Sequence, residues 1–170
     1  MKDVRPTSGK LLLALMSILE SKGKLNNCSF LDLFAGTGRV GIEALKRGAG
    51  MVCFVETLKN RAGEINNAIP SEYKEFSTVL ALELRRALSW LTKRGVVFDV
   101  IFADPPYNDG WDKTLVTILE KNHSLLKDGG VFIYEHSARE NIEHGTWKSA
   151  ESRIYGESAL TFFSKENLIN

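Results

Sequence analysis

The fold is decided by the stretch VVFDVIFADPPY, residues 96–107, in which an apolar run ends at two prolines. Residues 96–103 are rich in Val, Ile and Phe, which is typical of a strand buried inside a parallel sheet. Pro105 and Pro106 carry no backbone N–H, so the strand must end there. The chain therefore leaves the sheet at a carboxyl edge, where open α/β sheets bind their ligands. There, the Asp104 carboxylate, unpaired carbonyls and the Tyr107 ring could grip a planar ring by its exocyclic amine.

Predicted strands and helices alternate along the rest of the chain. Strands are expected at residues 29–34, 51–55, 77–82, 96–103 and 131–135, and helices at 8–21, 38–47, 59–68, 84–94 and 112–126, with a turn at 127–130. Thr7 or Ser8 would cap the first helix. Residues 148–164 alternate like a hairpin that turns near Gly156. This order predicts a single α/β domain, a mostly parallel doubly wound sheet with a C-terminal antiparallel hairpin.

Composition limits the possible partners. A chain of 170 residues with 44% apolar content can bury one good core. Its net charge of +1 gives no general basic field of the kind that non-specific nucleic-acid binders carry. Residues 1–24 are an exception, with five basic and two acidic side chains. This segment is either a phosphate-contacting arm or a solvated tail.

Neither the cysteines nor the histidines have a metal-binding pattern, so no metal is expected. Cys28 and Cys53 form no C-x-x-C pair, and a buried, inert thiol is expected at Cys53. The sequence contains no signal peptide and no apolar stretch long enough to cross a bilayer. We therefore expect a reduced, cytoplasmic protein that does not contact a membrane.

A glycine loop, DLFAGTG at residues 32–38, joins the first predicted strand to the helix that follows. Gly36 and Gly38 let the backbone turn sharply and let a ligand approach the main chain. Gly41 completes a nominal G-x-G-x-x-G pattern, so a dinucleotide fold is one possibility. Glu56 ends the next strand 20 residues after Gly36, where an acid would hold ribose hydroxyls. These features suit either NAD or S-adenosylmethionine.

The residues before the glycines favour the methyl donor. Asp32 and Phe34 stand where a dinucleotide fingerprint usually has plain apolar residues. An acid there would repel a pyrophosphate but can bind the cationic amino group of a methionine moiety. No downstream segment resembles a hydride-transfer site, whereas the Asp104–Tyr107 loop suits methyl transfer to an amine.

Eight short segments resemble the RsmD family, bacterial enzymes that methylate guanine N2 in 16S ribosomal RNA. They are RPT (5–7), DLFAGTG (32–38), GIEAL (41–45), RGA (47–49), FVE (54–56), FDVIFADPPY (98–107), EHS (135–137) and YG (155–156). The resemblance runs from residue 5 to about 163, in the order that the family has. It implies a Rossmann-like class I S-adenosylmethionine-dependent methyltransferase fold over residues 1–170.

The resemblance also implies site residues. S-adenosylmethionine would be bound by Asp32, Phe34, Gly36, Gly38, Glu56 and Glu83. Glu83 stands where the family usually has an Asp that contacts adenine. Arg5, Thr7 and Lys10 would contact the RNA, although Leu11–Leu13 replace the basic and acidic residues that usually follow. The partner would be 16S rRNA within the assembled or assembling small subunit, bound by a monomer.

The expected reaction is an in-line displacement in which guanine N2 attacks the sulfonium methyl. The Asp104 carboxylate and the Pro105 carbonyl would accept hydrogen bonds from the amine and stabilise its developing positive charge. Pro106 would hold the φ angle of the loop, and Tyr107 would stack on the flipped base. Trp111 lies just beyond this loop, either as a core or rim aromatic or at the mouth of the substrate site.

Other readings stay open at this stage. An amino-methyltransferase acting on adenine N6 of DNA or RNA, or on a protein glutamine, uses a closely similar tetrapeptide. A DNA modifier would usually need a separate target-recognition domain, for which the chain has no spare length. A non-catalytic nucleotide-binding module and a dehydrogenase are the remaining alternatives.

Overall fold

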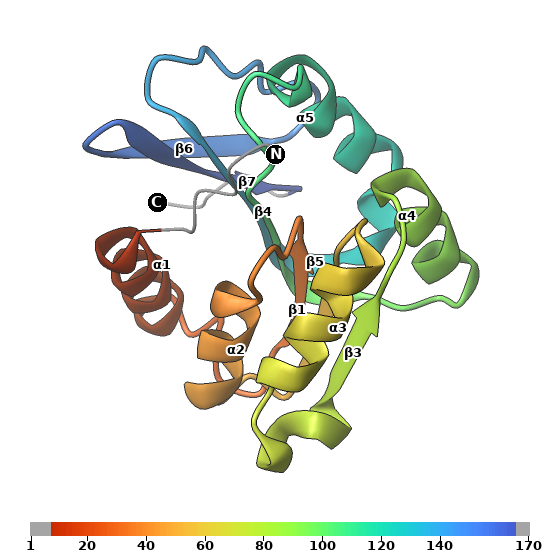
Figure 1. The fold of residues 1–170 in the computed structure, drawn as a ribbon. Coiled ribbons are helices and arrows are strands. Elements are labelled where there is room, and N and C mark those ends of the chain that lie inside the picture. Colours follow the sequence, from red (N-terminus) through yellow and green to blue (C-terminus); the bar gives the residue numbers. More distant parts are fainter. Residues whose placement is uncertain (1–7, 166–170) are drawn as a thin grey trace.

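The computed structural model describes residues 8–165, which form a seven-stranded sheet with helices packed on it (Figure 1). The strands are β1 (Ser29–Leu33), β2 (Met51–Val55), β3 (Ser77–Leu80), β4 (Phe98–Ala103), β5 (Leu126–Ser137), β6 (Ser149–Tyr155) and β7 (Ser158–Ser164). The helices are α1 (Gly9–Ser21), α2 (Arg39–Lys46), α3 (Lys59–Ala68), α4 (Leu84–Lys93) and α5 (Trp111–Lys121), with short 3-10 turns η1 (Ser71–Phe76) and η2 (His123–Leu125).

The strand order is β3-β2-β1-β4-β5-β7-β6. The first five strands in this order are parallel, whereas β7 runs antiparallel to both β5 and β6. The predicted doubly wound sheet with a terminal hairpin is therefore confirmed. The order reverses between β1 and β4, which makes the carboxyl ends of these two strands the topological switch point of the sheet.

Alternating strand residues feed two cores, one on each face of the sheet. Phe30 and Phe102 belong to the core beneath α1, α2 and α3, whereas Leu31 and Ala103 belong to the core beneath α4 and α5. Figure 1 shows α1 and α2 on one side of the sheet and α4 and α5 on the other. Because β1 and β4 are covered on both faces, their near-continuous apolar sequences bury fully.

The main error in the predicted elements lies at residues 127–130, which were expected to form a turn. They belong to β5, where the pairing with β4 shifts register between Phe98 and Val100. Gly129 has a φ of +73°, which only glycine adopts without strain. The glycine pair therefore makes a bulge inside a long strand.

The predicted helix over 112–126 is also too long. α5 ends at Lys121, and the side-chain amide of Asn122 donates a 2.8 Å hydrogen bond to the carbonyl of Ile118. This bond satisfies one of the last helical carbonyls, and η2 follows at once. β4 is also shorter than predicted. It begins at Phe98 and not at residue 96, and the side chain of Val97, which precedes the strand, is exposed.

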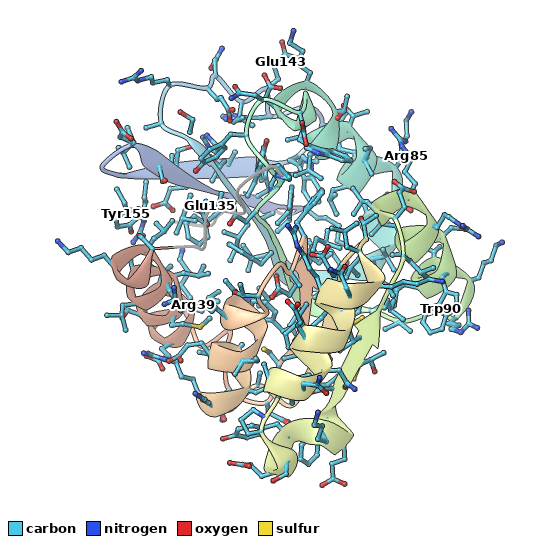
Figure 2. All side chains as sticks on the ribbon, in the orientation of Figure 1. Arg39, Arg85, Trp90, Glu135, Glu143 and Tyr155 are labelled. Atoms are coloured by element: carbon cyan, nitrogen blue, oxygen red, sulfur yellow. The ribbon has the colours of Figure 1, made fainter. Side chains whose placement is uncertain are left out.

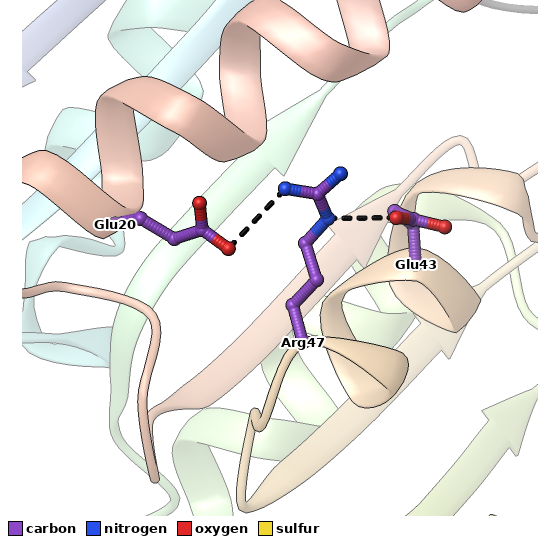
Figure 3. Close-up of polar contacts among 3 residues, drawn as sticks. All are labelled: Glu20, Glu43 and Arg47. Carbon is purple, nitrogen blue, oxygen red and sulfur yellow. Dashed lines mark hydrogen bonds and ion pairs between the residues drawn. The ribbon is translucent and has the colours of Figure 1, made fainter.

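Polar contacts tie α1 to α2 on their shared face (Figure 3). The Nε atom of Arg47 donates to Glu43 at 2.7 Å, and one of its terminal nitrogens donates to Glu20 at 3.2 Å. Ser8 caps the start of α1 by accepting from the amide of Leu11 at 3.2 Å. The cap stabilises the start of α1. Its apolar face and the contacts of Glu20, Arg47 and Glu43 hold α1 beside α2 on the sheet.

Candidate active site

Strand register brings four segments to one level at the carboxyl edge of the sheet. Leu33 pairs with Val55 on one side and with Ala103 on the other, and Ala103 pairs with Tyr134 of β5. The residues that follow these pairs are Phe34, Glu56, Asp104 and Glu135. The predicted cofactor loop and the predicted catalytic loop therefore leave the sheet side by side, at its switch point.

The glycine loop is held in a turn that places its amides at this edge. Phe34 has a φ of +57° and Gly36 has the same value, while Gly38 has a φ of +78°. A bulky residue in the left-handed region is rare, and such strain concentrates at functional sites. The amide of Ala35 donates to the carbonyl of Val55 at 2.9 Å, which fixes the loop to β2.

Glu56 is the acid that organises the loop. It is buried, and its Oε2 atom accepts from the amide of Gly36 at 3.0 Å while Oε1 accepts from the amide of Leu58 at 3.1 Å. Each carboxylate oxygen has a second acceptor position, so the group can still take two hydroxyl donors. This geometry suits the ribose role predicted for Glu56.

Asp32 lies one residue inside the edge, on the α2 side of β1. Its side chain is 1% exposed and accepts a 3.0 Å hydrogen bond from the amide of Gly41 in the first turn of α2. Burial and, to a smaller extent, the charges of Asp104 and Glu56 raise the pKa of Asp32 to about 8, against the opposing effect of the Gly41 hydrogen bond. Three carboxyl groups thus act on one another at this edge.

This concentration of acid decides between the two cofactors that the sequence allowed. A dinucleotide would bring a doubly negative pyrophosphate to an edge that already disfavours negative charge. S-adenosylmethionine brings a sulfonium and an ammonium group, both of which lower the cost of ionising Asp32 and Asp104. The residues present therefore fit S-adenosylmethionine.

The loop after β4 is anchored at both ends. Pro105 is buried and Pro106 is exposed. The hydroxyl of Tyr107, a half-buried residue, shares a 3.3 Å hydrogen bond with the hydroxyl of Ser158, at the start of β7. Burial raises the pKa of Tyr107, and the nearby carboxylates of Glu135 and Asp104 raise it as well. The terminal hairpin thus helps to position this loop.

A small cavity adjoins the loop, and its walls include residues to which the sequence assigned no role. Its lining includes Tyr107, Trp111, Tyr134, Glu135, His136 and Glu140. The Trp111 ring meets the Phe34 ring edge-on, with centroids 5.0 Å apart, which links the two loops. Glu135 could have been found from its sequence position, because it is an acid at the end of an apolar strand, like Asp104.

Both ring nitrogens of His136 make hydrogen bonds within the protein. Its Nδ1 atom lies 2.8 Å from the carbonyl of Ser137, which can only accept, so Nδ1 carries the proton. Its Nε2 atom lies 2.7 Å from the hydroxyl of Thr161, which lies 2.7 Å from the hydroxyl of Ser152. Burial lowers the pKa of His136, so the neutral ring accepts from Thr161. This chain crosses β5, β7 and β6 and holds the hairpin in register.

Glu83 has a structural role at the start of α4. Its carboxylate caps α4, accepting from the amides of Arg85 at 3.1 Å and Arg86 at 3.3 Å. The contact of Glu83 with adenine stays a prediction. Among the predicted RNA contacts, Lys10 is exposed on α1, while Arg5 and Thr7 lie outside the described residues.

The leucine run that departs from the family pattern has a structural explanation. Leu11 and Leu12 are buried in the core beneath α1, and only Leu13 of the three is exposed. Two of the positions where polar RNA contacts were thought to be missing therefore face the sheet.

Over residues 8–165, no group of three or more His, Cys, Asp or Glu side chains lies close enough together to hold a metal. In the same range none of the helices has the length and apolar content that spanning a membrane requires. Both cysteines are buried and free, and burial raises the pKa of Cys53 to about 12. The expectation of an inert thiol at Cys53 is confirmed.

Comparison with known proteins identifies the family. The family described as Conserved hypothetical protein 95 matches residues 1–164. The chain belongs to this family. It is the RsmD family whose motifs were recognised in the sequence. The Ribosomal RNA small subunit methyltransferase D of Buchnera aphidicola is 30% identical over 162 residues, which cover 89% of this chain and 78% of that protein.

Solved structures agree with this assignment. A hypothetical protein of Thermus thermophilus is 27% identical and superposes with a TM-score of 0.82, covering 96% of this chain and 90% of that one. A Thermus thermophilus 16S rRNA N2 methyltransferase, solved in complex with AdoMet and guanosine, has a TM-score of 0.74 at 22% identity, covering 96% of this chain and 44% of that one. The RsmD-family chain thus has the class I methyltransferase fold.

The raised pKa of Asp32 predicts how stability depends on pH. An ordinary aspartate titrates near pH 4, so the cofactor-free folded state binds an extra proton between about pH 4 and pH 8. The free energy of unfolding therefore falls as the pH rises through this window. Asp32→Asn keeps an oxygen acceptor for the Gly41 amide and removes the titration.

Thermal melts of the two proteins from pH 5 to pH 8.5 check this prediction. Relative to Asp32→Asn, the wild type should lose at least about 1 kcal/mol, or roughly 2–4 °C in melting temperature. A difference in melting temperature that stays constant across the series would mean that Asp32 ionises normally in the folded protein.

Proposed function

We propose that this RsmD-family chain is an S-adenosylmethionine-dependent rRNA methyltransferase that modifies the exocyclic N2 amine of a guanine in 16S rRNA. The observation that carries the proposal is the position of Asp104. Its carboxyl group lies at the switch point of the sheet, level with the cofactor loop, and its charge acts on Asp32. A group placed there can hold an amine against a methyl donor bound to the glycine loop.

The cofactor is S-adenosylmethionine, whose sulfonium supplies an electrophilic methyl group. Asp32 would hold its amino end, the backbone at Gly36 and Gly38 would lie alongside it, and Glu56 would accept from its ribose hydroxyls. Phe34, held in the left-handed region against Trp111, shapes the wall of this site.

The chain's own residues prepare the nucleophile. The lone pair of a guanine N2 amine is delocalised into the ring, which makes the nitrogen a poor nucleophile. Hydrogen bonds from its two N–H groups to the Asp104 carboxylate and the Pro105 carbonyl favour a pyramidal nitrogen that points at the methyl group. They also stabilise the positive charge that develops on the nitrogen. Positioning of two bound reactants supplies most of the acceleration.

Tyr107 holds the base beside the catalytic loop. Stacking of the base on Tyr107 contributes about 1–3 kcal/mol by analogy with other base–aromatic contacts. The hydrogen bond to Ser158 keeps the Tyr107 ring at the mouth of the cavity. We expect Arg5, Thr7 and Lys10 to contact the RNA, and the enzyme to act as a monomer on the assembled or assembling small subunit. The relative in Buchnera aphidicola, which is named a small subunit methyltransferase, supports this substrate.

Transfer of labelled methyl from S-adenosylmethionine tests the proposal. The substrates are unmodified small ribosomal subunits, free 16S rRNA, DNA and a protein with an exposed glutamine, each followed by nucleoside or peptide analysis. We expect N2-methylguanosine from the subunits or the 16S rRNA. Label in N6-methyladenosine or in glutamine would assign the chain to one of the related amino-methyltransferase reactions.

A further inference from the structure

Four cations gather on the exposed face of α4 and the residue after it. Arg85, Arg86, Lys93 and Arg94 form what we call the α4 basic stripe, and all four are exposed. The segment 84–94 contains no acidic residue. Within residues 8–165, none of the four makes an ion pair. The stripe is therefore a local positive field on a protein with a net charge of +1.

The packing of α4 on the sheet uses none of these four cations. The buried face of α4 consists of Leu84, Ala87, Leu88 and Leu91, spaced as an amphipathic helix requires. The four cations lie outside this buried face. At Arg85, Arg86 and Lys93, uncharged polar residues would serve the fold equally well and repel one another less.

One of the cations is held in place by an aromatic ring. The guanidinium of Arg94 lies 3.6 Å from the centroid of the half-buried Trp90 ring, and it donates to the carbonyl of Trp90 at 3.3 Å. Stacking orients the guanidinium plane and leaves its remaining N–H groups available. Such a fork matches the oxygens of a phosphate. An open hollow lined by the four cations, Ser89 and Trp90 lies over this part of the helix.

The stripe starts at the edge that carries the active site. α4 begins at Leu84, four residues after β3 ends at Leu80, so Arg85 and Arg86 lie at the carboxyl edge of the sheet. At 1.5 Å per residue the helix then carries the stripe about 14 Å away from that edge. Figure 2 places Arg85 and Trp90 on the outer rim of the molecule, away from the β6–β7 hairpin. A strand that enters the active site can therefore continue along α4.

We propose that the α4 basic stripe binds the phosphate backbone of the RNA substrate next to the target base. This inference rests on the proposed function for the identity of the RNA. Charge complementarity favours a polyanion, and stacked arginine with donors along about 14 Å fits successive phosphates. An anionic membrane fits less well, because the stripe lacks the exposed apolar face that interfacial helices insert.

The salt dependence of RNA binding tests the stripe. The variants are R85Q/R86Q and K93Q/R94Q. The control, K46Q/K121Q, removes the same charge from exposed lysines in the last turns of α2 and α5. Binding of 16S rRNA and of small subunits is measured between 50 and 300 mM KCl, and S-adenosylmethionine affinity and melting temperature are followed in parallel. Each phosphate contact contributes about 0.7–0.9 to the slope of log affinity against log salt.

We expect each stripe variant to lower that slope by about 1–2 and to raise the KM for the RNA at least about tenfold, with S-adenosylmethionine affinity unchanged. The control should change the KM less than about twofold. Stripe variants that bind RNA like the control, or that lose only binding to anionic vesicles, would overturn the inference. Stripe-dependent RNA binding by a wild type that methylates no RNA would uphold the stripe and refute the proposed function.

Discussion

Asp104→Ala and Asp104→Asn should lower kcat for methyl transfer about 10³-fold while S-adenosylmethionine still binds. In the proposed mechanism the carboxylate accepts from the amine and faces the positive charge that develops on it, an interaction stronger in the transition state than in the ground state. Asn keeps the shape and one acceptor but removes the charge. Both variants should therefore lose turnover without a matching loss of cofactor affinity, measured by labelled methyl transfer and by calorimetry.

A second measurement separates a catalytic Asp104 from a structural one. The charge of Asp104 helps to raise the pKa of Asp32, so Asp104→Asn should lower that pKa. The stability loss attributed to Asp32 should then be smaller and should end at lower pH in melts of the cofactor-free variant. The Asp104→Asn variant could show a shifted Asp32 titration and still methylate its substrate. That result would show that Asp104 lies close to Asp32 but does not act in the reaction.

Glu56→Ala should weaken S-adenosylmethionine binding by about 10–100-fold, the equivalent of about 1.5–3 kcal/mol for hydrogen bonds to a charged group. The change removes the ribose acceptor and also leaves the amides of Gly36 and Leu58 without their carboxylate partner. Isothermal calorimetry gives the affinity directly.

Glu56→Gln is the matched control, because it keeps one acceptor oxygen for the loop. Its affinity should lie between those of the wild type and Glu56→Ala. A cofactor product analogue without the ribose 2′-hydroxyl, S-2′-deoxyadenosylhomocysteine, makes the test specific. It should bind the wild type less tightly than the parent compound but bind Glu56→Ala equally well. An unchanged affinity in Glu56→Ala would remove Glu56 from the cofactor site.

Much of the fold could be read from local patterns. The apolar runs at β1, β2 and β4 and the prolines after Ala103 are local signals, because a buried strand needs continuous apolar residues and proline cannot extend a ladder. The same locality explains why the glycine loop, Glu56 and Asp104 could be identified. Each of them follows directly on a strand end.

Other features depend on contacts between distant residues. Trp111 meets Phe34, Tyr107 meets Ser158, and Thr161 satisfies His136, across 77, 51 and 25 positions of the chain. The bulge at residues 127–130 arises from pairing with β4, so the sequence alone indicated a turn. Glu83 caps α4, a contact that was not predicted, because a helix start satisfies its free amides with the nearest acceptor.

The sequence by itself determined the order of strands and helices, the family, and the two loops that are proposed to carry the chemistry, because these depend on neighbouring residues. Only the tertiary structure decided what meets at the sheet edge. Parallel register sets Phe34, Glu56, Asp104 and Glu135 at one level, and burial raises the pKa of Asp32 beside them. Register and desolvation are properties of the packed sheet, since they exist only after segments far apart in the chain have come together.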